Sequence, residues 1–110
     1  MPRHQFVVLT EAVPGREAEF EEWYDNQHLP DLLKVPGIVG AQRFNVQQVM
    51  AGVEFPKWVS LAIYEIESGH PQAVIEEIMA RSGGEQMPLS EALIVPTALQ
   101  VLATAVKKAS

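Results

Sequence analysis

The chain has 110 residues, a formal net charge of −6 and a hydrophobic share of 47%. This length predicts a single domain, residues 1–110, and the hydrophobic share is sufficient for a core. With 14 acidic residues against 8 basic ones, the sequence lacks the clustered cations that bind nucleic acids or anionic membrane surfaces. It contains no cysteine, which excludes disulfides, thiolate metal sites and cysteine nucleophiles.

Targeting and membrane segments are not predicted either. The N-terminal residues lead straight into a short apolar strand pattern, without the longer apolar stretch and small-residue cleavage site of a secretory signal. No run approaches the roughly 18 apolar residues that a membrane-spanning helix needs. We therefore expect a cytoplasmic protein with neither a nucleic-acid nor a membrane partner.

The first predicted elements are a strand and a helix. Residues 5–12 (QFVVLTEA) are typical of a β-strand, and Pro14-Gly15 marks its end. A helical pattern starts at Arg16, with glutamates in the early turns, where acidic side chains interact favourably with the helix dipole. One mostly apolar helix face is expected from the spacing of Phe20, Trp23, Tyr24 and Gln27.

Pro30 disfavours helical geometry at the residue before it, so the helix should end or kink there. A short turn over residues 31–34 and the turn signal Val35-Pro36-Gly37 follow. A second strand is predicted over residues 38–50 (IVGAQRFNVQQVM), and residues 51–56 form a connection.

The second half of the chain predicts a strand, a helix and a strand. A third strand covers residues 57–66 (KWVSLAIYEI), and a second helix starts at Ser68-Gly69-His70-Pro71. Its buried stripe is Val74, Ile75, Ile78 and Met79, and Ser82-Gly83-Gly84 ends it. Residues 85–96 are interpreted as a loop with a turn of helix at residues 89–93, and residues 97–106 (TALQVLATAV) as the last strand.

This β-α-β-β-α-β order predicts an α+β, ferredoxin-like fold, in which two helices lie on one face of a four-stranded antiparallel sheet. Two helices cover only that one face, yet Phe6 and Val8 alternate with Val7 and Leu9, so both faces are apolar. A second copy packing with isologous symmetry is the economical cover, and predicts a homodimer. We expect a space for a ligand between the two sheets, lined by Trp58, Ser60, Ala62 and Tyr64. The alternative is a dry dimer core.

A polar constellation lies at the end of the first helix. Tyr24 and His28 are four residues apart and therefore neighbours on one helical face. Asp31 follows three residues later and is expected to accept a hydrogen bond from the imidazole, which would support a general base. Tyr24 could donate to a developing oxyanion or enolate. Arg43 on the second strand could bind a substrate carboxylate, and Asn26 a polar substituent.

Each of these residues also has a structural interpretation. His28 could interact with the dipole at the helix C-terminus, and Asp31 could cap the next turn. Trp23 is typical of core packing, and Arg43 could pair with a surface glutamate. The three histidines of the sequence have no short spacing, so no metal site is predicted. Neither a phosphate-binding glycine loop nor a nucleophile elbow is present.

Residues 22–44, with the order Trp-Tyr-x-x-x-His-Leu-Pro-Asp-Leu-Leu, then Val-Pro-Gly and Arg-Phe, resemble the dimeric α+β barrel superfamily. The nearest resemblance is to its EthD-like and muconolactone-isomerase-like branches, with a weaker match at Met87-Pro88-Leu89-Ser90. The resemblance implies a homodimer whose two sheets form a barrel, with a cavity in each subunit. Tyr24 and His28 match a tyrosine and a histidine that face this cavity in the lactone isomerases.

The resemblance also implies chemistry without a metal or organic cofactor, as in isomerases, lyases, cyclases and small-molecule oxygenases. The heme-degrading branch is disfavoured because no matching Asn stands on the first strand. Ala41 stands where the lactone isomerases have a polar residue, which argues against that specific reaction.

The sequence is therefore compatible with three functions. The first is a cofactor-independent enzyme, an isomerase or lyase acting by proton transfer on a small aromatic or lactone-like metabolite. Its catalytic residues would be His28, Tyr24 and Asp31, and its substrate-binding residues Arg43, Asn26, Trp23, Trp58 and Tyr64. The alternatives are a non-catalytic binding protein for small molecules and a cofactor-free oxygenase.

Overall fold

The structure, a computed structural model, describes residues 3–49 and 56–110. The elements follow the predicted order, except that the first helix is built from three consecutive pieces. They are β1 (Arg3–Ala12), α1 (Glu17–Trp23), the π-helical turn η1 (Tyr24–His28), α2 (Leu29–Leu33), β2 (Ile38–Asn45), β3 (Ser60–Glu67), α3 (Pro71–Arg81) and β4 (Leu93–Ala103).

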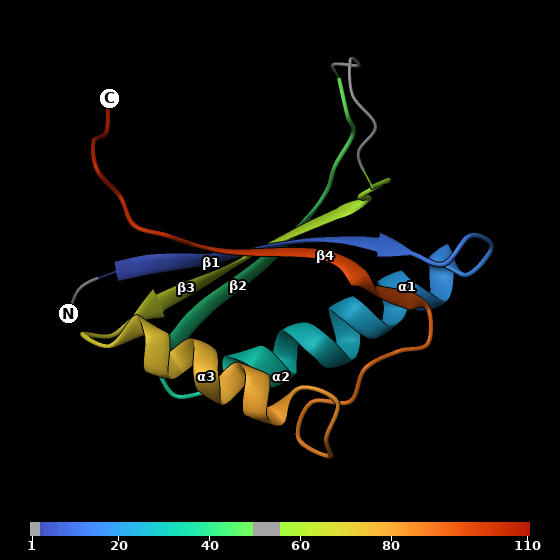
Figure 1. Cartoon of the computed structure of the whole chain (residues 1–110), viewed down its shortest axis with the longest axis horizontal. Helices are drawn as coiled ribbons and strands as arrows, with labels where there is room; N and C mark the ends of the chain where they lie inside the picture. Colours follow the sequence, from blue (N-terminus) through green and yellow to red (C-terminus); the bar gives the residue numbers. More distant parts are fainter. Residues whose placement is uncertain (1–2, 50–55) are drawn as a thin grey trace.

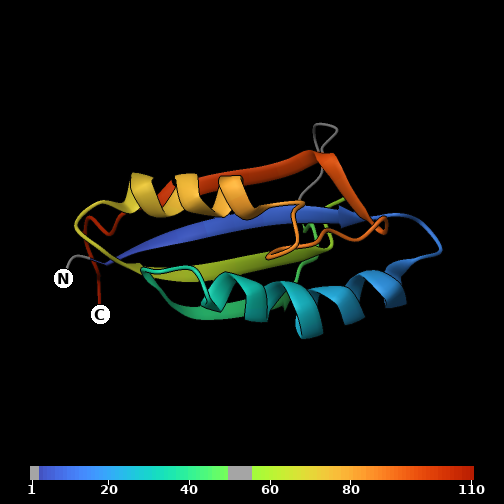
Figure 2. The same cartoon turned by 90° about the horizontal axis from the view of Figure 1, so that it is seen from below.

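The four strands form one antiparallel sheet in the order β2-β3-β1-β4. Both helical segments lie on the same face of this sheet, which confirms the predicted α+β, ferredoxin-like architecture (Figure 1). Seen from the helix side in Figure 2, α3 lies over the β4 and β1 side of the sheet, and α1 to α2 over the β2 and β3 side. The chain that follows α3 runs between the two helical segments.

Several strand boundaries differ from the prediction; β3, for example, starts at Ser60 instead of Lys57. β2 ends at Asn45 instead of extending toward Met50, which itself lies outside the described residues, as do residues 51–55 of the predicted connection. β4 starts at Leu93 instead of Thr97, so the predicted turn of helix at residues 89–93 is wrong. Pro96 lies within β4, and an edge strand tolerates proline at an irregularity. The register of β4 against β1 shifts between Leu9 and Glu11, opposite this proline.

The core lies between the sheet and the helical segments. Every second side chain of a strand points into this core. Examples are Phe6 and Val8 on β1 and Ala62 and Tyr64 on β3, all at most 8% exposed. Apolar side chains of the helical segments pack onto them: Phe20, Tyr24, Leu32, Val74 and Ile78. Of the predicted stripe of α3, Val74 and Ile78 are buried, whereas Met79 is 44% exposed.

The opposite face of the sheet is apolar, as predicted, but its composition differs. Leu61 and Ile63 of β3 point there, together with Phe44, Leu99 and Val101, each of the latter three at least 40% exposed. The predicted lining by Ser60, Ala62 and Tyr64 is therefore wrong, because these side chains point toward the helices. Alternation defines two faces of a strand but does not say which of them meets the helices.

No helix among the described residues is long and apolar enough to cross a membrane.

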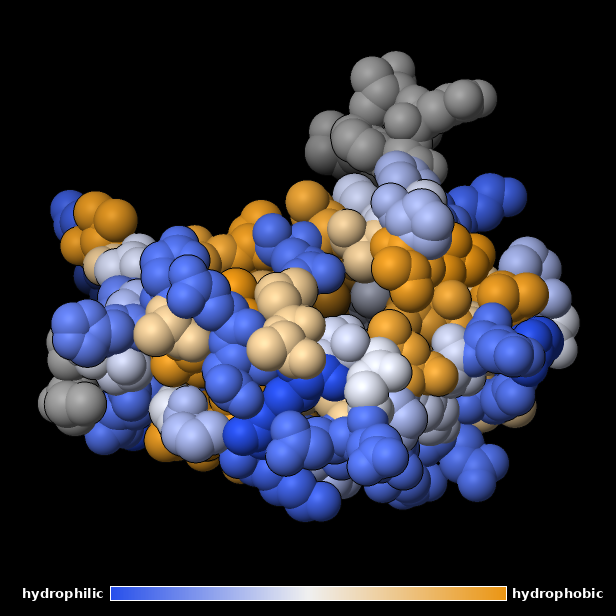
Figure 3. All heavy atoms as spheres, turned by 60° about the horizontal axis from the view of Figure 1, so that its bottom comes forward, coloured by the Kyte–Doolittle hydropathy of each residue, from blue (hydrophilic) through white to orange (hydrophobic). Residues whose placement is uncertain are grey.

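On the helix side, hydrophilic residues gather along one edge of the molecule and apolar residues on the other part of the face (Figure 3). The chain has a net charge of −6, and four of its acidic residues, the glutamates at positions 17, 19, 21 and 22, lie on α1.

Candidate functional site

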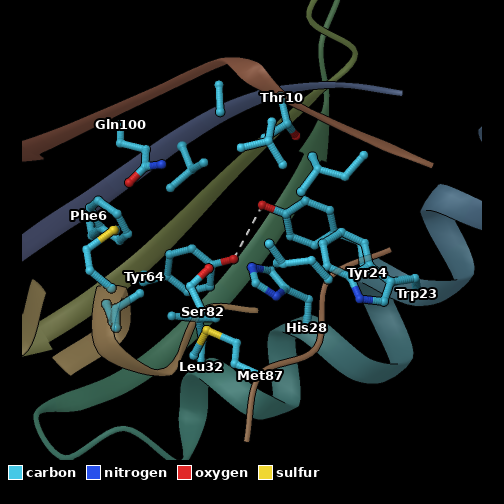
Figure 4. Close-up of a pocket in the computed structure, with 17 residues that line it drawn as sticks. Phe6, Thr10, Trp23, Tyr24, His28, Leu32, Tyr64, Ser82, Met87 and Gln100 are labelled. Atoms are coloured by element: carbon cyan, nitrogen blue, oxygen red, sulfur yellow. Dashed lines mark hydrogen bonds between the residues drawn. The ribbon is translucent and has the colours of Figure 1, made fainter. Parts of the chain in front are cut away.

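A cavity of about 80 Å³ lies between the sheet and the helical segments. Its walls come from β1, β3 and β4, from the first helical segment, and from α3 with the chain that follows it (Figure 4). Tyr24, His28, Trp23 and Tyr64 line it, so four of the eight predicted site residues meet in one cavity. Most of the remaining wall is apolar.

The π-helical turn brings the site residues together. The backbone N–H of Leu29 bonds the carbonyl of Tyr24, five residues earlier, which makes the turn wider than an α-helical one. The next residue, Pro30, has no N–H and its ring would clash with the carbonyl one α-turn earlier, so a widened turn accommodates it. The prediction that Pro30 ends or kinks the helix is thus realised as a π-turn in a helical run that continues to Leu33.

Three rings cluster at this turn. The His28 ring stacks on Trp23, with centroids 4.6 Å apart, and meets Tyr24 edge-on at 5.1 Å. Tyr24 is in turn in edge contact with Trp23 at 5.2 Å. The indole N–H of Trp23 donates a hydrogen bond of 3.0 Å to the carbonyl of Pro88, which holds the chain after α3 against the first helical segment. The imidazole is therefore held in place by aromatic neighbours.

Two tyrosines face each other across the cavity wall. The Tyr64 hydroxyl donates to the Tyr24 hydroxyl over 3.4 Å, and both residues are 1% exposed (Figure 4). Burial raises the pKa of Tyr24 and raises the pKa of Tyr64 well above its usual value. Both phenols therefore keep their protons at neutral pH. Because Tyr24 accepts from Tyr64, its own proton is available to a ligand oxygen.

His28 presents an unpaired nitrogen. Its Nδ1 is buried and has no hydrogen-bond partner among the described residues. Figure 4 shows the imidazole directed toward the two tyrosine hydroxyls. Burial lowers the pKa of His28 to about 4, and the negative charge of Asp31 opposes this shift. The ring is therefore neutral at neutral pH and offers one lone pair as a proton acceptor.

Asp31 does not hydrogen-bond His28 as predicted. The carboxylate is 4% exposed and accepts a hydrogen bond of 2.8 Å from the side chain of Gln27, one turn earlier. Lys34 lies 3.9 Å from its other oxygen. The carboxylate that was expected to orient the imidazole thus bonds the Gln27 amide instead. The effect of Asp31 on His28 is thus limited to the charge interaction that raises the histidine's pKa.

Arg43 lies outside the cavity, contrary to the expectation that it binds a substrate carboxylate. Its guanidinium forms a bidentate ion pair with Asp25, with distances of 2.7 Å and 3.1 Å. It also lies 3.8 Å from Glu21 and 5.7 Å from the centroid of the Tyr24 ring. The Arg43 guanidinium holds the pKa of Asp25 below its usual value. This arginine is engaged in tying β2 to the first helical segment.

The other predicted ligand-binding residues are also placed away from the cavity. Asn26 lines a separate groove on the outer side of the first helical segment, where Trp23 forms part of both walls. The Trp58 indole N–H donates a hydrogen bond of 2.9 Å to the carbonyl of Thr97, and this residue is not among those lining the cavity. Neither position supports direct contact with a ligand in the cavity.

Several cavity residues were not identified from the sequence. Thr10 on β1 is 3% exposed, and its Oγ1 has no partner of good hydrogen-bond geometry among the described residues. Its hydroxyl partly opposes the rise in the pKa of Tyr24 that burial causes. The signal was present, because Thr10 continues the inward phase of Phe6 and Val8. Gln100 required the register of β4. Met87 and Leu89 lie in the segment that weakly matched the superfamily.

The described residues contain no group of three histidine, aspartate or glutamate side chains that could hold a metal ion. The polar side chains that line the cavity carry two phenols, two hydroxyls, an indole, an imidazole and an amide. Such a set can donate and accept hydrogen bonds and can move a proton.

Comparison with known proteins gives similarity at the level of structure. No family model matches the sequence, and no curated protein matches it. Solved structures do match, among them an EthD-like protein from Ralstonia eutropha JMP134, with a TM-score of 0.62 and 11% identity over 99% of this chain and 97% of that one. The chain has the EthD-like fold.

Two further structures support this assignment. An EthD family protein from Bacillus halodurans C-125 has a TM-score of 0.53 and 14% identity over 94% of this chain and 99% of that one. A protein from Shewanella loihica PV-4, described as a candidate monooxygenase, has a TM-score of 0.61 and 12% identity over 97% of both chains. The superfamily resemblance is thereby confirmed for the fold, and a fold by itself does not determine the chemistry.

Proposed function

We propose that this protein is a cofactor-independent enzyme that transfers a proton within a small aromatic or lactone-like molecule. The observation that carries the proposal is the unpaired Nδ1 of the neutral His28, which lies in the cavity beside the Tyr24 hydroxyl. A buried nitrogen without a partner is costly in a folded protein. A proton acceptor in contact with substrate is the function that such a nitrogen supports best.

The chemical step uses two groups. Tyr24 donates a hydrogen bond to the substrate's carbonyl or hydroxyl oxygen and stabilises the negative charge that develops there. His28 takes the proton from the adjacent carbon and becomes an imidazolium, while the electron pair of the broken bond moves toward that oxygen. Return of the same proton to another carbon completes an isomerisation, and departure of a leaving group with the electron pair completes an elimination. The charge of Asp31 stabilises the transient imidazolium.

A cofactor-free oxygenase is a second candidate, favoured by the structural similarity to the candidate monooxygenase. It would begin with the same proton abstraction by His28, and molecular oxygen would then react with the substrate carbanion. A binding protein that uses the same cavity without turnover is the third. The apolar wall supports binding of a small molecule in all three cases.

The test is turnover of a panel of aromatic compounds and lactones, analysed by mass spectrometry in air and under nitrogen. His28→Ala should lower turnover by roughly 10² to 10⁴-fold with the fold preserved. His70→Ala is the matched control, because this histidine is exposed at the start of α3, and it should leave turnover unchanged. Unchanged turnover in His28→Ala would remove the assigned role, and oxygen dependence would favour the oxygenase. Binding without any conversion would favour the binding protein.

We also propose that a second copy of the chain covers the apolar outer face of the sheet, in the cytoplasm. The support is the exposure of Phe44, Leu99 and Val101 there, and the EthD-like fold. A sheet face of this kind is commonly covered by another layer. Leu99→Lys with Val101→Glu should convert a dimer to a monomer in light scattering, and a wild-type monomer would contradict this proposal.

A further inference from the structure

The walls of the cavity also bear on the charge of its ligand, provided that the cavity has the proposed function. None of the described residues that line the cavity is an aspartate, glutamate, lysine or arginine. Arg43, whose guanidinium lies 5.7 Å from the centroid of the Tyr24 ring, does not line the cavity and is paired with Asp25. An anionic group in this cavity would be removed from water without a cation to pair with it.

The titratable groups of the cavity reinforce its neutrality. His28 has a pKa of about 4 and is uncharged at neutral pH. Burial keeps Tyr24 and Tyr64 protonated. The charged groups next to the cavity on the first helical segment are themselves paired: Asp31 accepts from Gln27 and lies 3.9 Å from Lys34, and Asp25 pairs with Arg43. The cations among these groups already have carboxylate partners, which further disfavours an anionic ligand.

Two buried polar atoms nevertheless require partners. Thr10 Oγ1 and His28 Nδ1 are the buried side-chain atoms without a hydrogen bond in the described part of the chain, and both residues line this cavity. Figure 4 shows them on either side of the tyrosine hydroxyls. A ligand that carries oxygen at one end could bond to these atoms and to Tyr24. Its remaining atoms would contact Phe6, Val8 and Leu93.

We propose that the cavity selects an uncharged ligand with a hydroxyl or carbonyl oxygen at its inner end and an apolar body, and that it rejects the corresponding carboxylates. Tyr24 donates to the ligand oxygen, and His28 accepts from a ligand hydroxyl or acidic carbon. Thr10 can do either, since a hydroxyl is both donor and acceptor. The apolar body extends past Met79 and Val95, which are 44% and 54% exposed at the rim.

The experiment uses pairs of probes that match in shape and differ in charge at about pH 6.5. The pairs are 2-hydroxybenzamide with 2-hydroxybenzoate, and cyclohexanecarboxamide with cyclohexanecarboxylate. Affinity is measured by calorimetry, and the site by chemical-shift changes of Thr10 and His28. The uncharged member of each pair should bind at least roughly tenfold more tightly, because the anion loses its hydration without compensation. Equal or tighter binding of the anions overturns the inference, as does the absence of binding by every uncharged probe.

Thr10→Val gives a second, independent readout. This substitution removes a buried hydroxyl that has no partner of good hydrogen-bond geometry among the described residues, so the melting temperature should stay the same or rise. Affinity for the uncharged probes should nevertheless fall by roughly tenfold, because a hydrogen bond made only in the complex is lost. Thr104→Val is the control, since that hydroxyl bonds His4 away from the cavity. A lower melting temperature with unchanged affinity would show that Thr10 has only a structural role.

Failure of this inference and failure of the proposed function give different results. Selective binding of uncharged probes without turnover of any substrate leaves the inference intact and removes the enzymatic function. Turnover of a carboxylate that depends on His28 supports the enzymatic function and overturns the inference.

Discussion

The two helical segments use proline in opposite ways. In α3, Pro71 is the first helical residue, where its missing N–H would have no partner in any case, and the helix continues regularly to Arg81. In the first segment, Pro30 lies within a helical run from Glu17 to Leu33 and follows the π-turn. The regular helix supplies packing through Val74 and Ile78, whereas the irregular one supplies the site residues Tyr24 and His28.

The difference shows how one residue position changes what a helix can do. A widened turn shifts the side chains that follow it relative to those before it, and it is favoured at functional sites. Here it falls on the five residues that begin with Tyr24 and end with His28. It allows the histidine to stack on Trp23 while it meets Tyr24 edge-on.

The comparison can be tested first through stability. Phe20 in α1 is 1% exposed, and Phe20→Ala should reduce the free energy of unfolding by about 3 to 5 kcal/mol, because it leaves a large cavity in the core. Met79→Ala in α3 should change it by less than about 1 kcal/mol, since Met79 is 44% exposed. Urea denaturation measures both. Similar losses in the two variants would contradict the different burial of these two positions.

A second test acts on the prolines. Pro30→Ala restores a backbone N–H and permits a regular α-helical turn, which would move His28 relative to Tyr24. A misplacement of this kind should lower turnover or ligand affinity by roughly 10 to 100-fold. Pro71→Ala should leave both unchanged, because Pro71 lies at the first turn of α3 and away from the cavity. Unaltered activity in Pro30→Ala would contradict the link between the proline, the π-turn and the site.

The smallest expected effect is a dependence of stability on pH. His28 titrates at about 4 in the folded chain instead of 6.5, so between these values the unfolded chain binds one more proton. Stability is therefore lost as the pH falls, by about 2 kcal/mol between about pH 7.5 and about pH 5. His28→Gln should show a flatter dependence over this interval, measured by urea denaturation. Parallel pH profiles of the two proteins would argue against a buried neutral imidazole.

Much of the fold could be predicted because it depends on local patterns. Residues 5–12 are rich in strand-forming residues, and Arg16 to His28 have helical spacing, so the strand and the start of the helix were predicted close to their observed bounds. The proximity of Tyr24 and His28 also follows from sequence separation alone. The start of β4 could not be predicted from local patterns. Pro96 is acceptable there only because β4 is an edge strand, and the order of strands in a sheet is a tertiary property.

The sequence by itself determined the order of the elements, the two apolar faces of the sheet and the pair Tyr24 and His28. Tertiary structure decided which face of β3 meets the helices, and therefore placed Tyr64 in the cavity. It also decided the partners of the charged residues, since Gln27 holds Asp31 and Asp25 holds Arg43. The physical reason is that a side chain's partner depends on distances between separate elements, and periodicity within one element contains no information about them.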